Sequence, residues 1–310
     1  MNTRSNTMPE TFVRGGIAPL VMSATRPLYW SVRRELWENR SIYLAPLGIA
    51  AAFLVGFLIS LIHLPAKIRA LSALGPADYR HAIATPYDIA AGLMMITTVL
   101  VSVFYCLDAL YGERRDRSIL FWKSLPVSDR TTVLAKAIIP ILILPLITSV
   151  IGAAMHLIML IASSVVLLGS GLGVAPLWAQ LPWFQMSLLL LYHIITVHAL
   201  WPAPVYGWLM LVSAWARRAT FLWASLPVIA VAGVEALAFH SVHFAELVGG
   251  RLIGASAADE RTPGYMFPTN PMTHITPGTF LGSPGLWIGL AVTAAFVAAA
   301  TRLRRSGGPM

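Results

Sequence analysis

Three residues near position 240 have the types and spacing of metal ligands. His240, His243 and Glu246 form an HxxHxxE pattern, which on one continuous helix would place two imidazoles and a carboxylate on the same side. Zinc accepts such ligands. The pattern follows a long apolar run, however, and imidazoles favour the interface expected there. We therefore predict no metal, and keep a membrane-embedded enzyme with an outer-face His/Glu site as an alternative hypothesis.

Glu235 is an ionisable residue inside the preceding apolar run, VAGVEALAF. We expect it near the middle of a membrane span, where an unpaired charge costs several kcal/mol. It would then line a pathway, bind a proton, pair across an interface with a second copy, or bond to a neighbouring helix. The sequence leaves these roles open.

Motifs for hydrolysis and nucleotide binding are missing from the sequence. It contains neither HExxH nor GxSxG, so a membrane protease or lipase is a weak alternative. A phosphate-binding loop needs glycines before Lys-Ser or Lys-Thr, and the pair Lys123–Ser124 follows Trp122 without them. We predict no catalytic residue and no bound cofactor on this chain.

The composition is that of an integral membrane protein with an all-α fold. Of 310 residues, 57% are hydrophobic and 11% are charged, whereas soluble domains carry roughly a quarter charged residues. Six apolar runs are long enough to cross a bilayer as helices. They cover residues 42–62, 87–111, 137–168, 184–212, 221–244 and 285–301. A transmembrane domain thus occupies 42–301, between tails at 1–41 and 302–310, and prolines at 140, 145, 202 and 204 predict kinks or a broken helix in the third and fourth spans.

Basic residues alternate in density from one connection to the next. Most of the 22 Lys and Arg residues fall in the N-terminal tail, in residues 112–136, at 217–218 and at 302–305. The positive-inside rule then predicts a multi-pass protein with both termini in the cytoplasm. Because these clusters are short and lie between spans, we expect no nucleic-acid binding.

Residues 25–40 form an amphipathic pattern before the first span. Leu28, Val32 and Leu36 recur every four residues in TRPLYWSVRRELWENR. The flanking residues of interest are Arg33, Arg34, Glu35 and Trp37. We predict a helix lying in the membrane interface, with a polar arc that includes Glu35. A soluble helix packed on a small domain is the alternative.

The segment YGERRDRSILFWKSL concentrates charge and aromatic residues between two spans. On a helix, Glu113 and Arg117 can pair, which leaves Arg114 and other cations free. We expect a short helix on the cytoplasmic side that either docks a soluble partner or anchors the spans at the headgroup level. The candidate docking residues are Glu113, Arg114, Arg115, Asp116, Arg117, Ile119, Leu120, Phe121, Trp122 and Lys123.

Three stretches carry a resemblance to a known family. YGERRDRSILFWKSLPVSDRTTVLAK, SVRRELWENRSIYLAPL, and APVYGW followed by LMLVSAWARRATFLWASLP resemble the membrane (permease) subunit of bacterial ABC-2 type exporters. The similarity extends over residues 25–305 or so and is uninformative about cargo.

The resemblance implies a coupling helix near 114–125 that docks on a separate ATP-binding cassette subunit, which would hold ATP and magnesium. It also implies an interfacial connecting helix at 25–40, re-entrant hairpins within 245–283, and a location in the bacterial cytoplasmic (inner) membrane. The chain would act as a homodimer or with a related permease, in contact with membrane lipid. We expect export of a hydrophobic or amphipathic cargo, with a non-transporting sensor or scaffold subunit as a further alternative.

Overall fold

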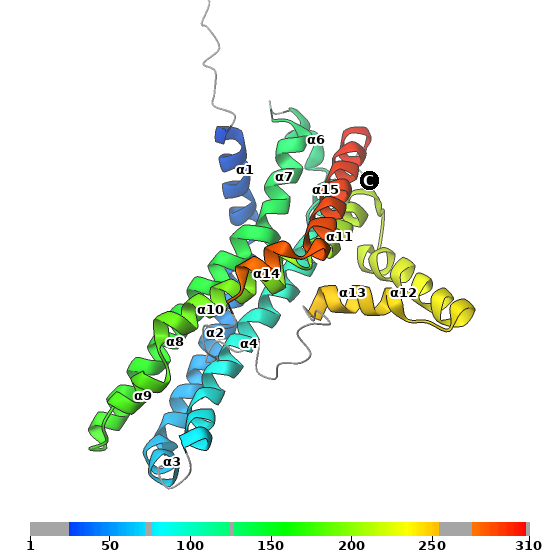
Figure 1. Ribbon diagram of the computed structural model, residues 1–310. Helices are drawn as coiled ribbons and strands as arrows, with labels where there is room; N and C mark the ends of the chain where they lie inside the picture. Colours follow the sequence, from blue (N-terminus) through cyan, green and yellow to red (C-terminus); the bar gives the residue numbers. More distant parts are fainter. Residues whose placement is uncertain (1–24, 72–75, 125–126, 254–274, 308–310) are drawn as a thin grey trace, which may run out of the picture.

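The computed structural model describes residues 25–71, 76–124, 127–253 and 275–307, and these residues form helices without any strand (Figure 1). The helices of the first half are α1 (Thr25–Glu38), α2 (Ser41–Ser60), η1 (Leu61–His63), α3 (Leu64–Leu71), α4 (Pro76–Asp108), α5 (Tyr111–Arg115), α6 (Ile119–Ser124), α7 (Asp129–Ile138) and η2 (Ile139–Ile143). Those of the second half are α8 (Leu144–Gly169), α9 (Ala175–Gln180), α10 (Trp183–Ile195), η3 (Thr196–Leu200), α11 (Ala203–Trp215), α12 (Thr220–Phe239), α13 (His243–Ile253), α14 (Pro277–Gly282) and α15 (Pro284–Ser306).

Six helical segments of the described chain are long and apolar enough to cross a membrane, which confirms the predicted polytopic all-α fold. They are Ser41–Ala70, Tyr79–Arg115, Asp129–Gly169, Ala175–Leu200, Thr220–Phe239 and Pro284–Ser306. The third has 41 residues. At about 1.5 Å per residue it is roughly 61 Å long, twice the ~30 Å of hydrocarbon in a bilayer. It must therefore project well beyond the apolar layer.

The fourth and fifth spans differ from the prediction. Residues 184–212 were expected to form one span with a kinked or broken helix. The break is present at Trp201–Pro202, but the spanning segment is Ala175–Leu200 and α11 is a separate, shorter apolar helix. The fifth helix was expected to reach residue 244 and ends at Phe239, because His240 adopts a left-handed conformation with φ 50°. Helix α13 then folds back beside α12 (Figure 1).

Prolines in the third and fourth spans distort the helices, as predicted, and the distortion takes the form of two π turns. In η2 the N–H of Leu144 donates to the carbonyl of Ile139, five residues back, rather than four. In η3 the N–H of Trp201 donates to Thr196 O at 2.9 Å, just before Pro202. The two π turns lie against each other inside the bundle.

One end of the bundle gathers the charge-rich segments. Helices α1, α6 and α7 and the C-terminal part of α15 meet there, while α3 and α9 lie at the opposite end (Figure 1). We call the first the basic end; it is the end at which α1, α5, α6, the start of α7 and the last turns of α15 meet. A core that includes Ile42, Leu110, Val133, Tyr206 and Ala300 lies beneath it.

The closest helix pairing in this half of the bundle joins α11 to α15. Gly207 makes it possible, because a Cβ there would lie 3.3 Å from both the Thr293 Cα and the Phe296 Cβ. The two backbones thus approach as small-residue contacts allow in membrane helices. This pairing holds α11 and the C-terminal residues of α15 as one support for the basic end.

Candidate functional site

Glu35 on α1 lies at the centre of a buried ion network at the basic end. Its side chain is fully buried, and the Lys136 ammonium on α7 lies 2.9 Å from its carboxylate. Arg34 donates to it at 2.7 Å, and the Tyr105 hydroxyl on α4 donates at 3.0 Å. The prediction that Glu35 belongs to a solvent-facing polar arc is wrong, because its partners come from two distant helices.

Glu113 on α5 extends the same network to the last helix. Its carboxylate lies 3.3 Å from Arg34, 3.2 Å from Lys136 and 2.9 Å from Arg304 on α15. The Arg304 Nε also lies 3.3 Å from Asp129, at the start of α7. Together these ion pairs join α1, α5, α7 and α15.

The network balances buried charges rather than leaving them alone. Two buried carboxylates face three cations, and Asp129 supplies a third carboxylate that is partly exposed. Burial by itself would raise the pKa of the Glu35 carboxyl, but the Lys136 ammonium and the Arg34 guanidinium outweigh it, so the pKa is lowered. Removing one member of such a set leaves another charge buried without a partner, which is costly.

Helix α5 is anchored to α11 from below. The Ser213 hydroxyl accepts the N–H of Leu110 at 3.0 Å and that of Tyr111 at 2.8 Å, which satisfies two donors at the start of α5. Arg114 is buried and donates to the carbonyl of Ala214. The expectation that Arg114 is free for a partner is therefore wrong. So is the predicted Glu113–Arg117 pair, because Glu113 bonds to Arg34, Lys136 and Arg304 and α5 ends at Arg115.

The expected single coupling helix is two short helices that meet at a corner. Arg117 forms the corner with φ 58°, a conformation that few residues other than glycine adopt. Beyond it, Ile119 is buried and anchors α6, while Leu120 and Phe121 are 59% and 60% exposed. The next helix, α7, is capped at its start, because the Ser128 hydroxyl accepts the N–H of Thr131 at 3.1 Å.

The remaining charged residues of this loop pair locally. Arg115 is half exposed and lies 3.6 Å from Asp108 and 2.9 Å from Asp116. The Lys123 ammonium donates to the carbonyl of Gly307 at 2.7 Å and so ties α6 to the end of α15. Trp122 is half-buried beneath the Arg34 guanidinium, 3.9 Å from its ring centroid. The loop thus has a fixed inner face and an exposed outer face.

Helix α1 stands beside α7 rather than across the end of the bundle (Figure 1). Its half-buried Val32 and Leu36 pack against the core below, as the apolar stripe predicts. Its outer face is aromatic and basic: the Arg33 guanidinium lies 5.2 Å from the Trp30 ring and 4.8 Å from that of Trp37. Trp37 is 65% exposed, which suits a headgroup-level anchor.

Glu235 bonds to a neighbouring helix, which is one of the roles that the sequence left open, and the HxxHxxE residues do not lie on one helix. The Glu235 carboxylate accepts the N–H groups of His243 at 3.0 Å and Phe244 at 2.8 Å, so it caps the start of α13 and does not sit alone at mid-span. The three metal-type residues do not share one helix face, because His240 ends α12 and His243 begins α13. Among the described residues, no group of three His, Cys, Asp or Glu side chains is arranged to hold a metal. Most of the predicted 245–283 hairpin region, residues 254–274, lies outside the described chain.

Sequence reasoning missed several members of the network. Lys136, Arg304, Asp129, Tyr105 and Ser213 were not among the candidate residues, although they link the predicted ones together. A signal was present for two of them: Lys136 directly precedes the third apolar run, and Arg304 lies three residues after the end of the last. A charged residue at the end of an apolar run is either solvated or paired with a charged residue at the end of another run.

Comparison of this chain with protein families, with curated proteins and with solved structures gives no match. The geometry itself, a membrane-type helical bundle whose basic end is held together by buried ion pairs, carries the functional argument below.

Proposed function

We propose that this chain is the permease subunit of an ATP-binding cassette exporter of the ABC-2 type, with a separate subunit hydrolysing ATP. One observation carries the proposal: the α5–α6 corner is fixed on its inner face and presents Leu120 and Phe121 outward at the basic end. Exposed apolar residues beyond the apolar spans, flanked by Arg115 and Arg117, suit a groove on a soluble partner.

The connections behind this surface support a coupling role. The corner is tied to α11 through Ser213 and Ala214, and to α1, α7 and α15 through Glu113. A displacement of α6 would therefore reach four helices through charged contacts that are costly to break. A loop that only anchored spans at the headgroup level would not need these links.

The same reading places the chain in the bacterial cytoplasmic membrane with the basic end inside. The proposal also includes a second permease copy, identical or related. Only 6% of the most apolar part of Thr220–Phe239 is buried against the other described residues, which leaves this helix free to contact a second copy. The cargo class that best suits apolar helices with few charges is a hydrophobic or amphipathic molecule. These assignments depend on the permease proposal and stand or fall with it.

Co-purification with a cassette ATPase produced together with this chain tests the proposal. We expect a stable complex in detergent or nanodiscs and a changed ATPase rate. Phe121→Ala combined with Arg117→Glu should weaken the complex at least tenfold without changing the yield of folded protein, since neither side chain is buried.

Phe184→Ala is the matched control, because Phe184 is also an exposed phenylalanine, 70% exposed, but lies in the first turn of α10 and not in α5 or α6. It should leave the complex intact. If the double variant bound the ATPase as well as the wild type, the α5–α6 corner would not be the docking surface. Absence of any complex with the wild type would contradict the permease assignment itself.

A further inference from the structure

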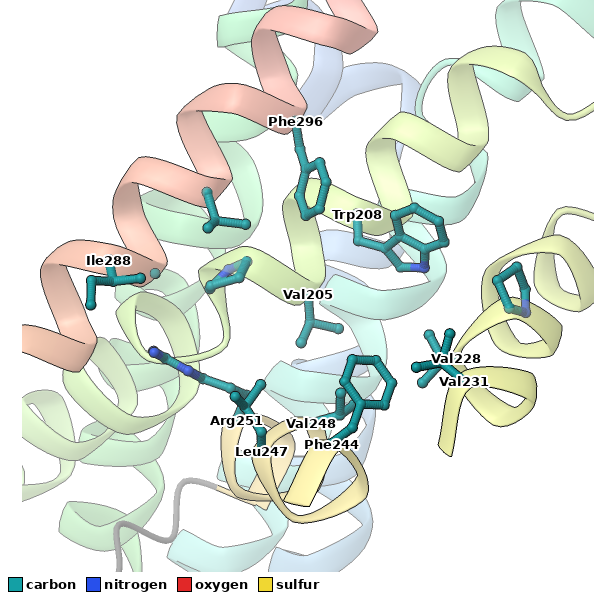
Figure 2. A pocket seen from close by; sticks show the side chains of 14 residues that line it. Val205, Trp208, Val228, Val231, Phe244, Leu247, Val248, Arg251, Ile288 and Phe296 are labelled. Atoms are coloured by element: carbon teal, nitrogen blue, oxygen red, sulfur yellow. The ribbon is translucent and has the colours of Figure 1, made fainter. Parts of the chain in front are cut away.

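A pocket of about 470 Å³ lies between α11, α15 and the hairpin of α12 and α13 (Figure 2). Its wall is almost entirely hydrocarbon and aromatic: Trp208, Val231, Phe244 and Phe296 come from the four helices. This volume is within the range of roughly 300–1,000 Å³ that small-molecule pockets occupy. Arg251 on α13 is the one charged residue in the described lining.

Arg251 is held in place by a specific cradle. Its guanidinium donates to the carbonyl of Trp201 at 3.1 Å and to that of Gly285 at 2.6 Å, and lies 4.1 Å from the Trp201 ring centroid. The Trp201 indole in turn donates to the carbonyl of Gly250 at 3.0 Å. Gly289 leaves the required space, because a Cβ there would lie 2.8 Å from the Arg251 Nη1. The cation is therefore positioned at the pocket edge by three elements (Figure 2).

The charge of Arg251 has no carboxylate partner among the described residues. Within the described parts of the chain its hydrogen bonds go to two backbone carbonyls, whereas a guanidinium offers five N–H donors. A cation that lies against an apolar wall, and whose acceptors among these residues are neutral, attracts an anion that also carries hydrocarbon.

The position of Arg251 along the membrane normal fits the headgroup layer on the side of the bilayer opposite the basic end. Its acceptor Gly285 and the network residue Arg304 are both on α15, and at about 1.5 Å per residue they lie roughly 28 Å apart along the helix. The hydrocarbon layer of a bilayer is about 30 Å thick. If Arg304 marks one boundary of that layer, Arg251 lies close to the other.

From these observations we infer that the pocket binds an anionic phospholipid of the surrounding membrane, with an acyl chain among α11, α12, α13 and α15 and the phosphate on Arg251. Charge complementarity selects the phosphate and the apolar wall selects the chain. This binding needs neither an ATPase partner nor transport, so it goes beyond the function proposed above and is tested separately.

Native mass spectrometry of the purified full-length protein, titrated with phosphatidylglycerol or phosphatidylcholine of identical chains, tests the inference. We expect the wild type to bind phosphatidylglycerol about tenfold more tightly. Both lipids offer a phosphate to Arg251, but the trimethylammonium group of phosphatidylcholine would bring a second cation close to the guanidinium, and like charges oppose binding. Arg251→Met should remove this preference. Arg80→Gln removes the same charge from an exposed position outside the pocket and should retain it.

A second variant keeps the test decisive if Arg251→Met folds poorly. Val231→Trp fills the pocket from the exposed side of α12, leaves the Arg251 cradle intact and should weaken binding of both lipids. Equal binding of the two lipids by the wild type, an unchanged preference in Arg251→Met, or unchanged binding of both lipids in Val231→Trp would overturn the inference. The inference would also be overturned if the preference for phosphatidylglycerol were absent from the wild type and present in the double variant Asp259→Asn, Glu260→Gln. That result would mean that a carboxylate of this chain, and not a lipid phosphate, binds Arg251.

Discussion

Replacing Glu35 by glutamine tests whether the buried network holds α1 to the bundle. The substitution keeps the shape of the side chain and removes its charge, so Lys136, Arg34 and the Tyr105 hydroxyl lose an anionic acceptor. Breaking a buried ion pair costs about 3–5 kcal/mol. Lys136 still has the Glu113 carboxylate at 3.2 Å, so we expect a loss near the low end, about 3 kcal/mol in the free energy of unfolding.

The assay is reversible unfolding of the purified protein in mixed micelles with an increasing fraction of denaturing detergent, followed by circular dichroism. Glu38→Gln is the matched control on the same helix: its side chain is 43% exposed and pairs with Arg34 at 3.6 Å. Such an exposed pair contributes about 0.5 kcal/mol or less.

Combining Glu35→Gln with Lys136→Met should cost less than the sum of the two single changes by more than about 1 kcal/mol, because the residues are in contact. The reasoning fails if Glu35→Gln costs no more than Glu38→Gln, or if the two changes are additive. Either result would mean that the charges are solvated rather than mutually buried.

Three further outcomes follow from the structure. The pKa of Glu35 is lowered in the folded state, so its contribution to stability is present above the unfolded value of 4.5 and is lost as pH falls through the folded pKa. Between about pH 5 and pH 3, the free energy of unfolding should therefore change less with pH in Glu35→Gln than in the wild type. Gly207→Leu should separate α11 from α15 and lower the unfolding free energy by about 1–3 kcal/mol, whereas Gly48→Leu, at a position where an added Cβ would have no atom within 4 Å, should be nearly neutral in the same micelle assay. Ser213→Ala should strand two buried N–H groups at the start of α5 and cost about 1–3 kcal/mol, against little change for Ser225→Ala, whose exposed hydroxyl bonds only within its own helix; equal effects of the two would refute the anchoring role.

The helices were predictable because the membrane imposes a simple requirement on the chain. About 20 consecutive apolar residues satisfy the backbone internally and cover ~30 Å of hydrocarbon, so composition and run length are enough to find the six spans. Their ends were less predictable. The stop at Phe239 depends on the left-handed His240 and on Glu235 capping α13, a local hydrogen-bond choice that hydropathy does not record.

The charged site was predictable only in part, because periodicity shows which face a residue occupies and not what covers that face. Glu35 has the same helical position whether water or Lys136 lies opposite, and the two are 101 residues apart in sequence. Arg304 and Glu113 are separated by 191. The loop at 113–123 was found by its density of charge, but which of its residues point inward was decided by the positive φ at Arg117, and no local pattern announces that conformation.

The π turn at Ile139–Ile143 also has a consequence for how this gene can tolerate change. A π turn in effect inserts one extra residue into an α-helix. Deleting one residue there would restore regular helix with little rotation of α7 relative to α8, because the wide turn already absorbs the extra residue. Lys136 and Asp129 would still face Glu35 and Arg304. A single-codon deletion in this stretch should therefore be tolerated, whereas one within the regular helix of α7 or α8 would rotate the residues beyond it by about 100° and separate these ion pairs.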